Sequence, residues 1–577
     1  MTIQQKKAKR VPNFRINAYT VAPSHPLGVK PSGNALFESA DLTKQAKIKD
    51  NLLGRLSRFP EELLMEFISY IDNPRDLHNL GCASRILYAY TYDEEHWRRL
   101  FIKEYIRMEN ESREPNANIY PFECTKWMGS WRKTVLKVEH EALIKSNDLI
   151  FSDLLYRPYQ CSQIDYLELF SKVIDFERRS SDLGHNLNSD FGIDRFDESE
   201  FSLEKFNNDF VNKPFILQCK KNPTRWPKWN LDSLLDKFSK VKFRQEAVKW
   251  DLRLYAEYFH NNRDESPLYL FDCNSEAVKT IRKEYSSPKI YNDDLFKLFQ
   301  ENNVNCRPDH RWLIVGPARS GSTFHKDPNQ TSAWNAGLTG LKLWVMLPPH
   351  VKPPGVSTDA NEEEVTSPVG IAEWVISGYY NDSVKLAQEG KCLIGVTFPG
   401  ECIYVPSGWW HTVINLTDSV AITENFVPLP ILPKVLMFFK HKKTQISGFH
   451  LKDFVHSVKQ FLGNVSDVKD LSTENLKMLN SFIESSKNYH FNNDDCGLHD
   501  RVEFETPLFE FFVELIRNSK YEANLNEAFE KVNEMENEEL KRKILDSHNN
   551  VKKSEVWHKL ASESKDQFSF GFDTNDM

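Results

Sequence analysis

Hydrophobic and polar residues alternate with different periods along the chain, and the change of period predicts where helices give way to strands. Between residues 56 and 71 the apolar positions recur at helical spacing, at Leu63, Leu64, Phe67, Ile68 and Ile71. Ser57 is the expected N-cap of this helix, and Pro60 is expected in its first turn. Residues 73–76 are expected to end the helix, and residues 77–90 predict a second amphipathic helix.

Short apolar runs rich in β-branched and aromatic residues begin near residue 214. They lie at 214–217, 312–315, 341–347, 401–405, 413–416 and 420–423. Pro and Gly separate them, which is typical of a β-sandwich or jelly roll. Residues 182–200 are polar and acidic and predict a surface loop. Beyond residue 431 the helical pattern returns, at 435–439, 454–458 and 509–516.

These patterns predict an α+β fold: a cupin-type double-stranded β-helix (jelly roll) flanked by N- and C-terminal helical regions. The expected domains are an extended N-terminal arm at 1–50, a helical domain at 51–110, a helical connector at 111–205, the barrel at 206–430, a C-terminal helical region at 431–565 and a tail at 566–577. The length agrees with such a division, because 577 residues are too many for one hydrophobic core.

Composition narrows the class of protein and its compartment. Hydrophobic residues make up 40% and charged residues 27%, which is typical of a soluble globular protein. No membrane-spanning helix is expected, because no stretch approaches about 18 uninterrupted apolar residues. The nine cysteines include no C-x-x-C pair, which favours free thiols and a location in the nucleus and/or cytoplasm. The formal net charge of −8 gives no indication of direct nucleic-acid binding.

Four short motifs follow one another in the predicted N-terminal helices. They are Phe59-Pro60, Asp76-Leu77, Cys82-Ala83-Ser84-Arg85 and Trp97-Arg98-Arg99-Leu100-Phe101. In this order they resemble an F-box. The resemblance implies docking to the Skp-type adaptor of a cullin–RING ubiquitin ligase, through exposed apolar residues such as Phe59, Leu63 and Leu64. An ordinary helical hairpin of the domain core is the alternative.

A candidate metal site comes from His325 and Asp327, which are two residues apart, together with His411 at the end of the motif Val405–His411. Two imidazoles and one carboxylate can hold one face of an Fe(II) ion and leave positions open for a co-substrate and O2. On a strand, His325 and Asp327 would point to the same face. A chance His-x-Asp pair and a packed core histidine are the alternatives.

A longer series of motifs surrounds these residues between positions 265 and 426. In chain order they are Ser266–Asp272, Asp293–Phe296, Arg311-Trp312, Gly316–Ser322, His325–Pro328, Thr331–Ala336, Gly340–Lys342, Pro399–Glu401, Val405–His411 and Ala421–Phe426. They resemble the JmjC family, and within it the phosphatidylserine-receptor-type subfamily of arginine demethylases and lysyl hydroxylases. The resemblance implies an oxygenase that uses Fe(II), 2-oxoglutarate as co-substrate, and O2.

The resemblance also implies a role for each matching residue. His325, Asp327 and His411 would ligate the iron. Lys342 would pair with the distal carboxylate of 2-oxoglutarate, and Thr423 would donate its hydroxyl to the same group. Such a partner would explain a lysine within an apolar strand, for which a snorkelling surface lysine is the alternative.

The remaining matching residues are expected to line the site. Tyr269, Ser322 and Asn335 fall at co-substrate or site-lining positions of the family. Asn425 would lie near the metal and support it indirectly. The tryptophans of this region are expected in the barrel core instead, namely Trp334, Trp344, Trp409 and Trp410.

Together these features predict a dioxygenase that hydroxylates or demethylates Lys or Arg side chains of proteins, histones included, and that recruits a ubiquitin ligase through the F-box-like region. Hydroxylation of a plain carbon leaves an alcohol, whereas hydroxylation of an N-methyl carbon releases formaldehyde, so both outcomes use the same residues. A non-catalytic F-box adaptor whose barrel only binds its target is the alternative. The helices beyond residue 430 predict a homodimer contact.

Overall fold

The computed structural model describes residues 18–21, 50–51, 53–111, 126–138, 164–187, 191–359, 362, 365–366, 370–463, 472–487 and 506–563. They form two compact units, one drawn from Met1–Asp294 and Pro308–Leu429, the other from Leu295–Arg307 and Pro430–Met577. Most of the predicted arm at 1–50 and all of the predicted tail at 566–577 lie outside the described residues.

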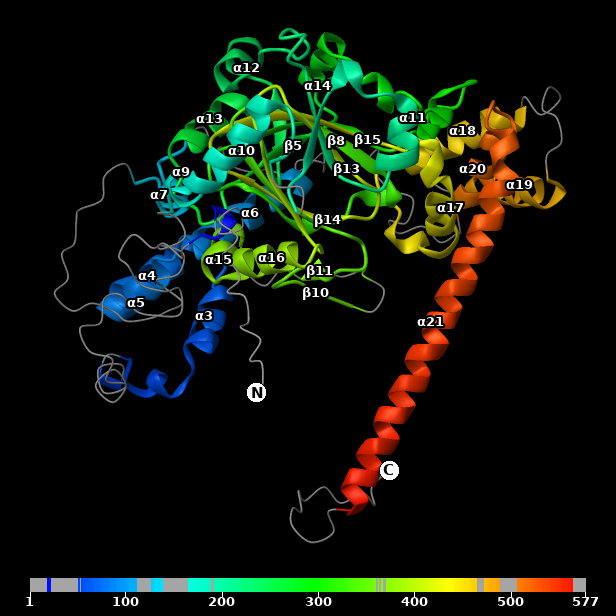
Figure 1. Cartoon of the computed structure of the whole chain (residues 1–577). Helices are drawn as coiled ribbons and strands as arrows, with labels where there is room; N and C mark the ends of the chain where they lie inside the picture. Colours follow the sequence, from blue (N-terminus) through cyan, green and yellow to red (C-terminus); the bar gives the residue numbers. More distant parts are fainter. Residues whose placement is uncertain are drawn as a thin grey trace, which may run out of the picture. The chain divides into compact units, whose positions relative to one another are not determined.

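Two sheets form the centre of the first unit (Figure 1). The larger sheet has nine strands in the order β1 (Asp194–Asp197), β2 (Phe215–Gln218), β13 (Cys402–Val405), β8 (Ser332–Thr339), β15 (Ser419–Phe426), β6 (Arg311–Gly316), β5 (Leu270–Asp272), β3 (Lys242–Gln245) and β4 (Val248–Asp251). The smaller has four, in the order β12 (Leu393–Thr397), β9 (Lys342–Leu347), β14 (Trp410–Asn415) and β7 (Gly321–His325).

Neighbouring strands run antiparallel, except that β1 and β2 are parallel. A separate antiparallel pair is formed by β10 (Ser357–Thr358) and β11 (Val365–Thr366). Two antiparallel sheets with helices before and after them confirm the predicted α+β fold with a cupin-type barrel.

Alternation along β9 separates the barrel interior from its outer surface. Its outward residues join one hydrophobic cluster: Leu343, Val345 and Leu347. Trp344 and Met346 join a second cluster together with Ala333 and Ile403 of the larger sheet, so this second cluster fills the space between the sheets. Since successive side chains of a strand point to opposite faces, Lys342 shares the interior face with Trp344.

The outer face of the smaller sheet is covered by helices. α10 (Ser171–Leu183), α15 (Ile371–Ile376) and α16 (Tyr379–Gln388) contribute buried residues to the same outer cluster as Leu343 (Figure 1). Tyr19 also belongs to this cluster and is fully buried. The N-terminal region therefore packs against the helices and sheet of the barrel at Tyr19.

A buried network of ion pairs links helix α10 to the larger sheet. Arg195 of β1 contacts Glu177 of α10 at 3.0 Å and Glu401 at 3.2 Å, and neither the Arg195 nor the Glu177 side chain is exposed. The predicted surface loop at 182–200 is therefore wrong: its second half includes a strand of the large sheet. The polar composition misled the prediction because ion pairs with Glu177 and Glu401 compensate the charge of a buried Arg195.

The N-terminal helical region differs from its predicted boundaries in detail. A 3₁₀ turn at Gly54–Arg58 precedes α3 (Glu61–Ser69), so Pro60, and not Ser57, is the N-cap residue. α4 (Pro74–Ala83) begins where the prediction had a break, because Asn73 caps it by accepting from the Arg75 N–H. The break after the first helix thus exists but lies earlier, at 70–73, and a second break at Ser84 precedes α5 (Arg85–Thr91). α6 (Glu94–Glu111) and α7 (Trp131–Leu136) follow.

The remaining helices of the first unit are short. They are α9 (Tyr166–Leu169), η2 (Glu198–Glu200), α11 (Leu203–Lys205), the π-helical η3 (Phe206–Phe210), α12 (Leu231–Phe238), α13 (Leu252–His260), α14 (Glu276–Ile281), η4 (Arg282–Glu284), η5 (Lys289–Tyr291), η7 (Pro328–Gln330) and η8 (Leu429–Ile431), of which η8 extends into the second unit.

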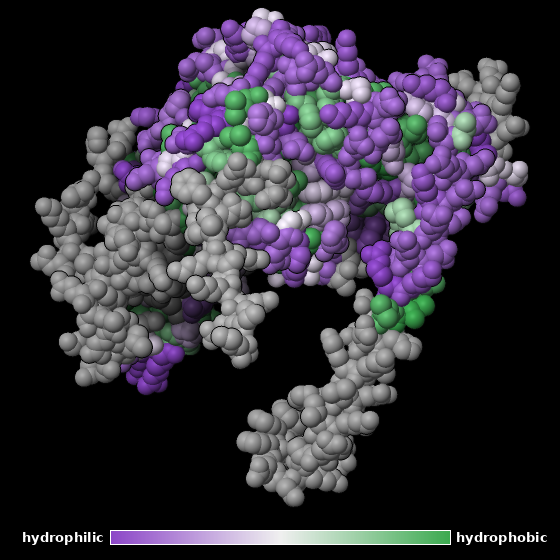
Figure 2. Space-filling model, in the orientation of Figure 1, coloured by the Kyte–Doolittle hydropathy of each residue, from purple (hydrophilic) through white to green (hydrophobic). Residues whose placement is uncertain are grey.

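The second unit is helical and has an aromatic core. Its elements are η6 (Leu295–Gln300), α17 (Leu432–His441), η9 (Lys443–Gln445), α18 (Leu451–Gly463), α19 (Thr473–Ser486), α20 (Leu508–Arg517) and α21 (Glu522–Glu563). Phe296, Phe439 and Phe512 pack against one another. On α21, Figure 2 shows a hydrophobic group beside hydrophilic residues, and the exposed side chains Leu540, Ile544 and Leu545 make it up.

Two further expectations concern membranes and thiols. Among the described residues no helix is long and apolar enough to cross a membrane. The cysteines of the described ranges are free thiols: Cys82, Cys219, Cys273, Cys306, Cys392 and Cys402.

Candidate metal and co-substrate site

The register of β7 and β14 brings the two candidate histidines together. His325 is directly opposite His411 in this antiparallel pair, so both side chains project to one face of the sheet, and their ring centroids are 4.1 Å apart. β7 ends at His325, so Asp327 follows the strand instead of lying on it, unlike the arrangement expected from the His-x-Asp spacing.

Asp327 nevertheless reaches the two rings. One ligand atom each from His325, Asp327 and His411 lie within 4.8 Å of one another, and the described residues hold no second group of three or more such ligands. The Oδ2 atom of Asp327 is buried and has no hydrogen-bond partner in the described part of the chain. Because an unpaired buried carboxylate oxygen is costly, these residues fit a divalent cation such as Fe(II).

Both imidazoles are oriented by backbone carbonyl groups. Nδ1 of His325 lies 2.8 Å from the Thr323 carbonyl oxygen, and Nδ1 of His411 lies 3.2 Å from that of Trp409. Since a carbonyl oxygen only accepts, Nδ1 carries the proton in each ring and the Nε2 lone pair is free. Burial lowers the pKa of His411 well below its ordinary value, and the adjacent His325 lowers it further, which favours the neutral, metal-binding form.

Asn425 of β15 supports Asp327 from the opposite sheet. Burial raises the pKa of the Asp327 carboxyl, whereas the neighbouring His325 and a hydrogen bond from Asn425 lower it. The Asn425 amide is itself fixed, because Nδ2 donates to Thr331 Oγ1 at 2.7 Å. Asn425 therefore lies beside a candidate metal ligand, and its supporting role stays a prediction.

Lys342 is a buried cation on the same interior face. Its Nζ donates to Tyr269 Oη at 3.0 Å and to Asn415 Oδ1 at 2.9 Å, and the residue is 1% exposed. Burial lowers the pKa of Lys342 to about 7, and no carboxylate among the described residues forms an ion pair with it. The snorkelling alternative is therefore wrong, and the site offers a partly neutralised ammonium that an anionic ligand would stabilise.

Thr423 and Asn335 lie side by side on two adjacent strands of the larger sheet, β15 and β8. They are paired in the β15–β8 register, and both side chains are buried. The Thr423 hydroxyl donates to the Trp334 carbonyl oxygen at 2.6 Å, so donation to a ligand carboxylate requires the hydroxyl to rotate. Both residues lie at neighbouring positions of the barrel, and their contact with a co-substrate stays a prediction.

Ser322 also lies on the interior side of the smaller sheet. It is opposite Val413, a residue of the inner cluster, because the β7–β14 pairing shifts between His411 and Val413. An irregularity of this kind locally redirects side chains, and such bulges often lie next to active sites.

Sequence reasoning missed Asn415. It accepts from Lys342 and donates through Nδ2 to Ser320 Oγ at 2.9 Å, which fixes the oxygen of the amide toward the lysine. Its place in the sequence could have indicated this position. Asn415 is four residues beyond His411 on one strand, so the two side chains share a face. Of the predicted core tryptophans, Trp334, Trp344 and Trp410 are buried and Trp409 is half-buried.

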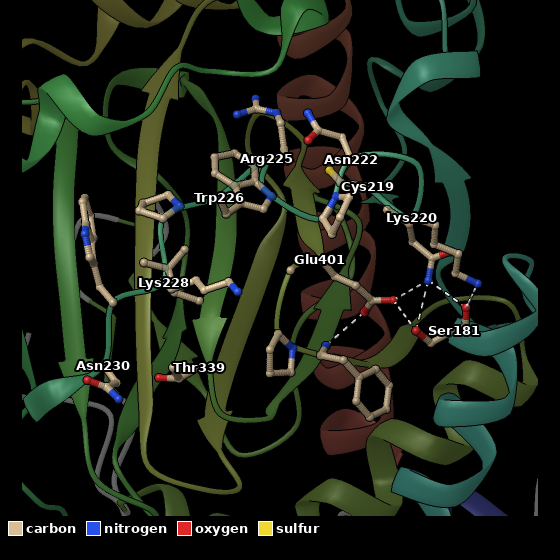
Figure 3. A pocket seen from close by; sticks show the side chains of 18 residues that line it. Ser181, Cys219, Lys220, Asn222, Arg225, Trp226, Lys228, Asn230, Thr339 and Glu401 are labelled. Carbon is tan, nitrogen blue, oxygen red and sulfur yellow. Dashed lines mark hydrogen bonds between the residues drawn. The ribbon is translucent and has the colours of Figure 1, made fainter. Parts of the chain in front are cut away.

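A cleft lies apart from the candidate site residues. This cleft of about 580 Å³ is lined by the loop after β2, the end of β8 and the β12–β13 turn, and none of the candidate site residues lines it (Figure 3). Glu401 in its wall already accepts hydrogen bonds from Ser181 and Gln218, both at 2.7 Å. The Glu401 carboxylate is thus satisfied within the chain, whereas the buried Nε1 of Trp226, also in the lining, has no hydrogen-bond partner among the described residues.

A jelly-roll barrel with a His-Asp-His donor set on its interior face defines a cupin-like protein. Residues 201–430 match the family model of the cupin-like domain, and residues 56–103 match the F-box-like model. The chain belongs to the JmjC-type family of cupin-like proteins and carries an F-box-like region.

Curated relatives agree with this membership. Arginine-specific demethylase JMJ22 of Arabidopsis thaliana is 34% identical over 453 residues, which cover 75% of this chain and 80% of that protein. Bifunctional arginine demethylase and lysyl-hydroxylase psr-1 of Caenorhabditis elegans is 34% identical over 247 residues, covering 41% and 61% respectively. 2-Oxoglutarate and iron-dependent oxygenase JMJD4 of Gallus gallus is 28% identical over 189 residues, covering 32% and 42%. The chain is thus related to demethylases and hydroxylases of this type.

Proposed function

We propose that the chain is an Fe(II)- and 2-oxoglutarate-dependent dioxygenase that hydroxylates or demethylates Lys or Arg side chains of proteins. The observation that carries the proposal is the shared interior face of two groups. One is the donor set His325, Asp327 and His411, and the other is the buried cation Lys342. The first group suits a metal and the second suits a carboxylate, so together they suit a metal-chelating dicarboxylate.

Each residue has a task in this proposal. His325, Asp327 and His411 hold Fe(II), which with bound 2-oxoglutarate supplies O2-dependent oxidation of a C–H bond. Lys342 binds the distal carboxylate, and Asn415 and Tyr269 orient its ammonium. Thr423 and Asn335 line the co-substrate, and Asn425 holds Asp327 in place. The interior tryptophan Trp344 lies beside the His411 ring, at 6.3 Å between centroids.

The substrate class rests on the relatives named above, which include an arginine demethylase and a lysyl hydroxylase. Both reactions begin with oxidation of a carbon next to or near a basic side-chain nitrogen. Histones and a nuclear location are part of the proposal, with the cytoplasm as the other compartment. A mass gain of one oxygen atom in the target indicates hydroxylation, and loss of a methylene unit indicates demethylation.

The F-box-like region supports a second activity, recruitment of a cullin–RING ligase through a Skp-type adaptor. The predicted docking residues are corrected in one respect: Leu64 is 6% exposed and belongs to the core, whereas Phe59 and Leu63 are exposed. Phe67 and Tyr70 are exposed as well and extend the surface along α3. The exposed apolar side chains of α21 support a homodimer contact, for which Leu540→Asp and sedimentation of the full chain are the test.

A non-catalytic adaptor is the alternative function. It predicts binding of a target without consumption of 2-oxoglutarate. The complete donor set and the buried Lys342 favour the enzyme, because an adaptor has no use for an unpaired cation inside its barrel. Aerobic incubation of the full chain with Fe(II), 2-oxoglutarate and nuclear protein extract is the test, with His411→Ala as control. Succinate formation that depends on His411 supports the proposal, and its absence from the unaltered chain contradicts it.

A further inference from the structure

The F-box-like region touches the segment that carries a co-substrate residue. Arg98 lies on α6, within the Trp-x-x-Leu part of the F-box motif. Its Nη1 donates to the Ser266 carbonyl oxygen at 3.1 Å, and its Nη2 contacts Glu246 Oε2 at 3.3 Å. Nη1 also lies 4.0 Å from Oδ2 of the buried Asp264. Ser266 precedes Tyr269 by three residues. The Arg98 guanidinium therefore binds both the segment that carries Tyr269 and the Glu246 carboxylate.

Glu246 continues the connection. Its other oxygen, Oε1, accepts from the Tyr269 backbone N–H at 3.2 Å. The carboxylate therefore lies between Arg98 and Tyr269 and bonds to both. Glu246 lies in the turn between β3 and β4 with φ +50°, a left-handed conformation that is uncommon for a residue with a side chain, so the backbone itself aims this carboxylate.

Tyr269 completes the path to the site. Its hydroxyl accepts from Lys342 Nζ at 3.0 Å. The backbone on either side is held by α13, because the Leu268 N–H donates to Tyr258 Oη at 2.8 Å and the Leu270 N–H to Tyr255 Oη at 3.3 Å. The backbone N–H of Tyr269 itself donates to the Glu246 carboxylate.

We propose that Arg98 of the F-box-like region is a positioning residue of the 2-oxoglutarate site, acting on Lys342 through Glu246 and Tyr269. The inference rests on the proposed function. The side chain of Arg98 is 15% exposed and that of Glu246 is 46% exposed. Without Arg98, the half-exposed carboxylate is free to turn to solvent, and the Tyr269 N–H and the Ser266 carbonyl group lose their partners. The two matched regions, at 56–103 and 201–430, are then one functional unit instead of two independent modules.

Arg99 supplies a matched control on the same helix. Its Nη1 contacts Asp72 at 3.2 Å and its Nη2 donates to the Ile71 carbonyl oxygen at 2.9 Å, and both partners lie within the F-box-like region. Arg98→Ala and Arg99→Ala remove the same charge from neighbouring positions. They differ in whether the contacts of Arg98 with Glu246, Ser266 and the buried Asp264 are lost, and the double-mutant cycle below separates the path through Tyr269 from the loss at Asp264.

The test measures equilibrium binding of 2-oxoglutarate to the Mn(II)-loaded full chain by titration calorimetry. Arg98→Ala is expected to weaken binding about three- to tenfold, as for one indirect charge-assisted contact. Mn(II) affinity and the Arg99→Ala variant are expected to match the unaltered chain. Arg98→Lys is expected to be intermediate, because a single ammonium cannot reproduce the forked contact. Glu246→Gln tests the same path if Arg98→Ala does not fold.

A double-mutant cycle with Tyr269→Phe separates positioning from general damage. If Arg98 acts through the Tyr269 hydroxyl, its removal has little further effect in the Tyr269→Phe background. An undiminished effect there, equal effects of Arg98→Ala and Arg99→Ala, or unchanged binding by Arg98→Ala each overturn the inference. Failure of the unaltered chain to bind 2-oxoglutarate overturns the proposed function instead.

Discussion

His411 lies directly across an antiparallel ladder from His325, and the backbone carbonyl groups of Trp409 and Thr323 turn the Nε2 atoms of both rings to the interior. The strand register alone thus places two histidines that are far apart in the chain where both can bind one metal ion. Asp327 adds a buried oxygen that lacks a hydrogen-bond partner among the described residues. The protein alone therefore leaves this oxygen uncompensated, which is the role that a bound cation would fill.

This geometry predicts opposite effects on metal binding and on stability. Asp327→Ala is expected to weaken Fe(II) or Mn(II) binding by at least about tenfold and to raise the melting temperature of the metal-free chain, because an unpaired buried oxygen is removed. Metal content after dialysis and thermal melting measure the two effects. His350→Ala, a change at an exposed histidine, is the control. Undiminished metal binding by Asp327→Ala contradicts the ligand assignment.

Removal of the buried cation is expected to affect the co-substrate but not the metal. Lys342→Met keeps much of the side-chain volume and removes a charge-assisted contact of about 1.5–3 kcal/mol, which corresponds to roughly ten- to hundredfold weaker 2-oxoglutarate binding. Calorimetric titration of the Mn(II)-loaded protein is the measurement. Lys385→Ala, which removes an exposed lysine on α16, should bind normally. Equal binding by Lys342→Met would show that another group holds the dicarboxylate.

The depressed pKa of Lys342 has a further consequence for the pH dependence of binding. Burial lowers this pKa from 10.5 to about 7, so between these values the unfolded chain binds more protons than the folded one. The contribution of Lys342 to stability is therefore least favourable below pH about 7 and improves as pH rises toward 10.5. A bound dicarboxylate stabilises the ammonium, so affinity for 2-oxoglutarate should fall by about tenfold per pH unit above the pKa of the free protein.

Proton uptake when 2-oxoglutarate binds tests the predicted direction of this pH dependence. At mildly alkaline pH, titrations in two buffers of different ionisation enthalpy should report uptake of up to one proton for the unaltered chain. Lys342→Arg remains charged throughout this range and should show none of this uptake. Proton release by the unaltered chain would reverse the assigned sign.

The exposed apolar surface of α3 predicts a specific loss of adaptor binding. Phe59 and Phe67 pack edge to face with centroids 5.6 Å apart, and they are 38% and 51% exposed. Replacing both by Asp should abolish co-purification with a recombinant Skp-type adaptor and leave 2-oxoglutarate binding intact. Leu203→Asp, at a leucine with 41% exposure outside this region, is the matched control. Adaptor binding that survives the double change would place the docking surface elsewhere.

The buried network of Arg195 predicts a large stability effect without a catalytic one. Arg195→Ala leaves Glu177 and Glu401 without their shared cation, which should cost about 3–5 kcal/mol of unfolding free energy. Lys221→Ala breaks the pair with Glu200, in which both side chains are more than half exposed, and should change stability little. Chemical denaturation of both variants tests the contrast. Equal, small effects would show that the network is not stabilising.

Sequence patterns predicted the strands best where alternation and β-branched residues agreed. The predicted strand at 341–347 corresponds to β9, and that at 214–217 corresponds to β2. In both cases the observed ends lie within one residue of the predicted ends. β1 was missed because its Arg195 is buried by ion pairs, which no hydrophobic pattern reveals. The roles of Lys342 and Thr423 came from family resemblance, and they stay predictions. The path from Arg98 to Tyr269 depends on contacts between distant segments, so no spacing in the sequence indicates it.

Tyr19 gives the N-terminal region a direct part in the integrity of the barrel. Its hydroxyl donates to the buried Glu177, and Val21 exchanges two backbone hydrogen bonds with the Asn381 side chain on α16. A chain shortened to begin beyond Val21 would open a cavity the size of a tyrosine behind the smaller sheet and leave Glu177 with one partner fewer. Proteolytic trimming at this end would therefore loosen the layer that backs the metal-binding strands, although the cut lies hundreds of residues from them in the sequence.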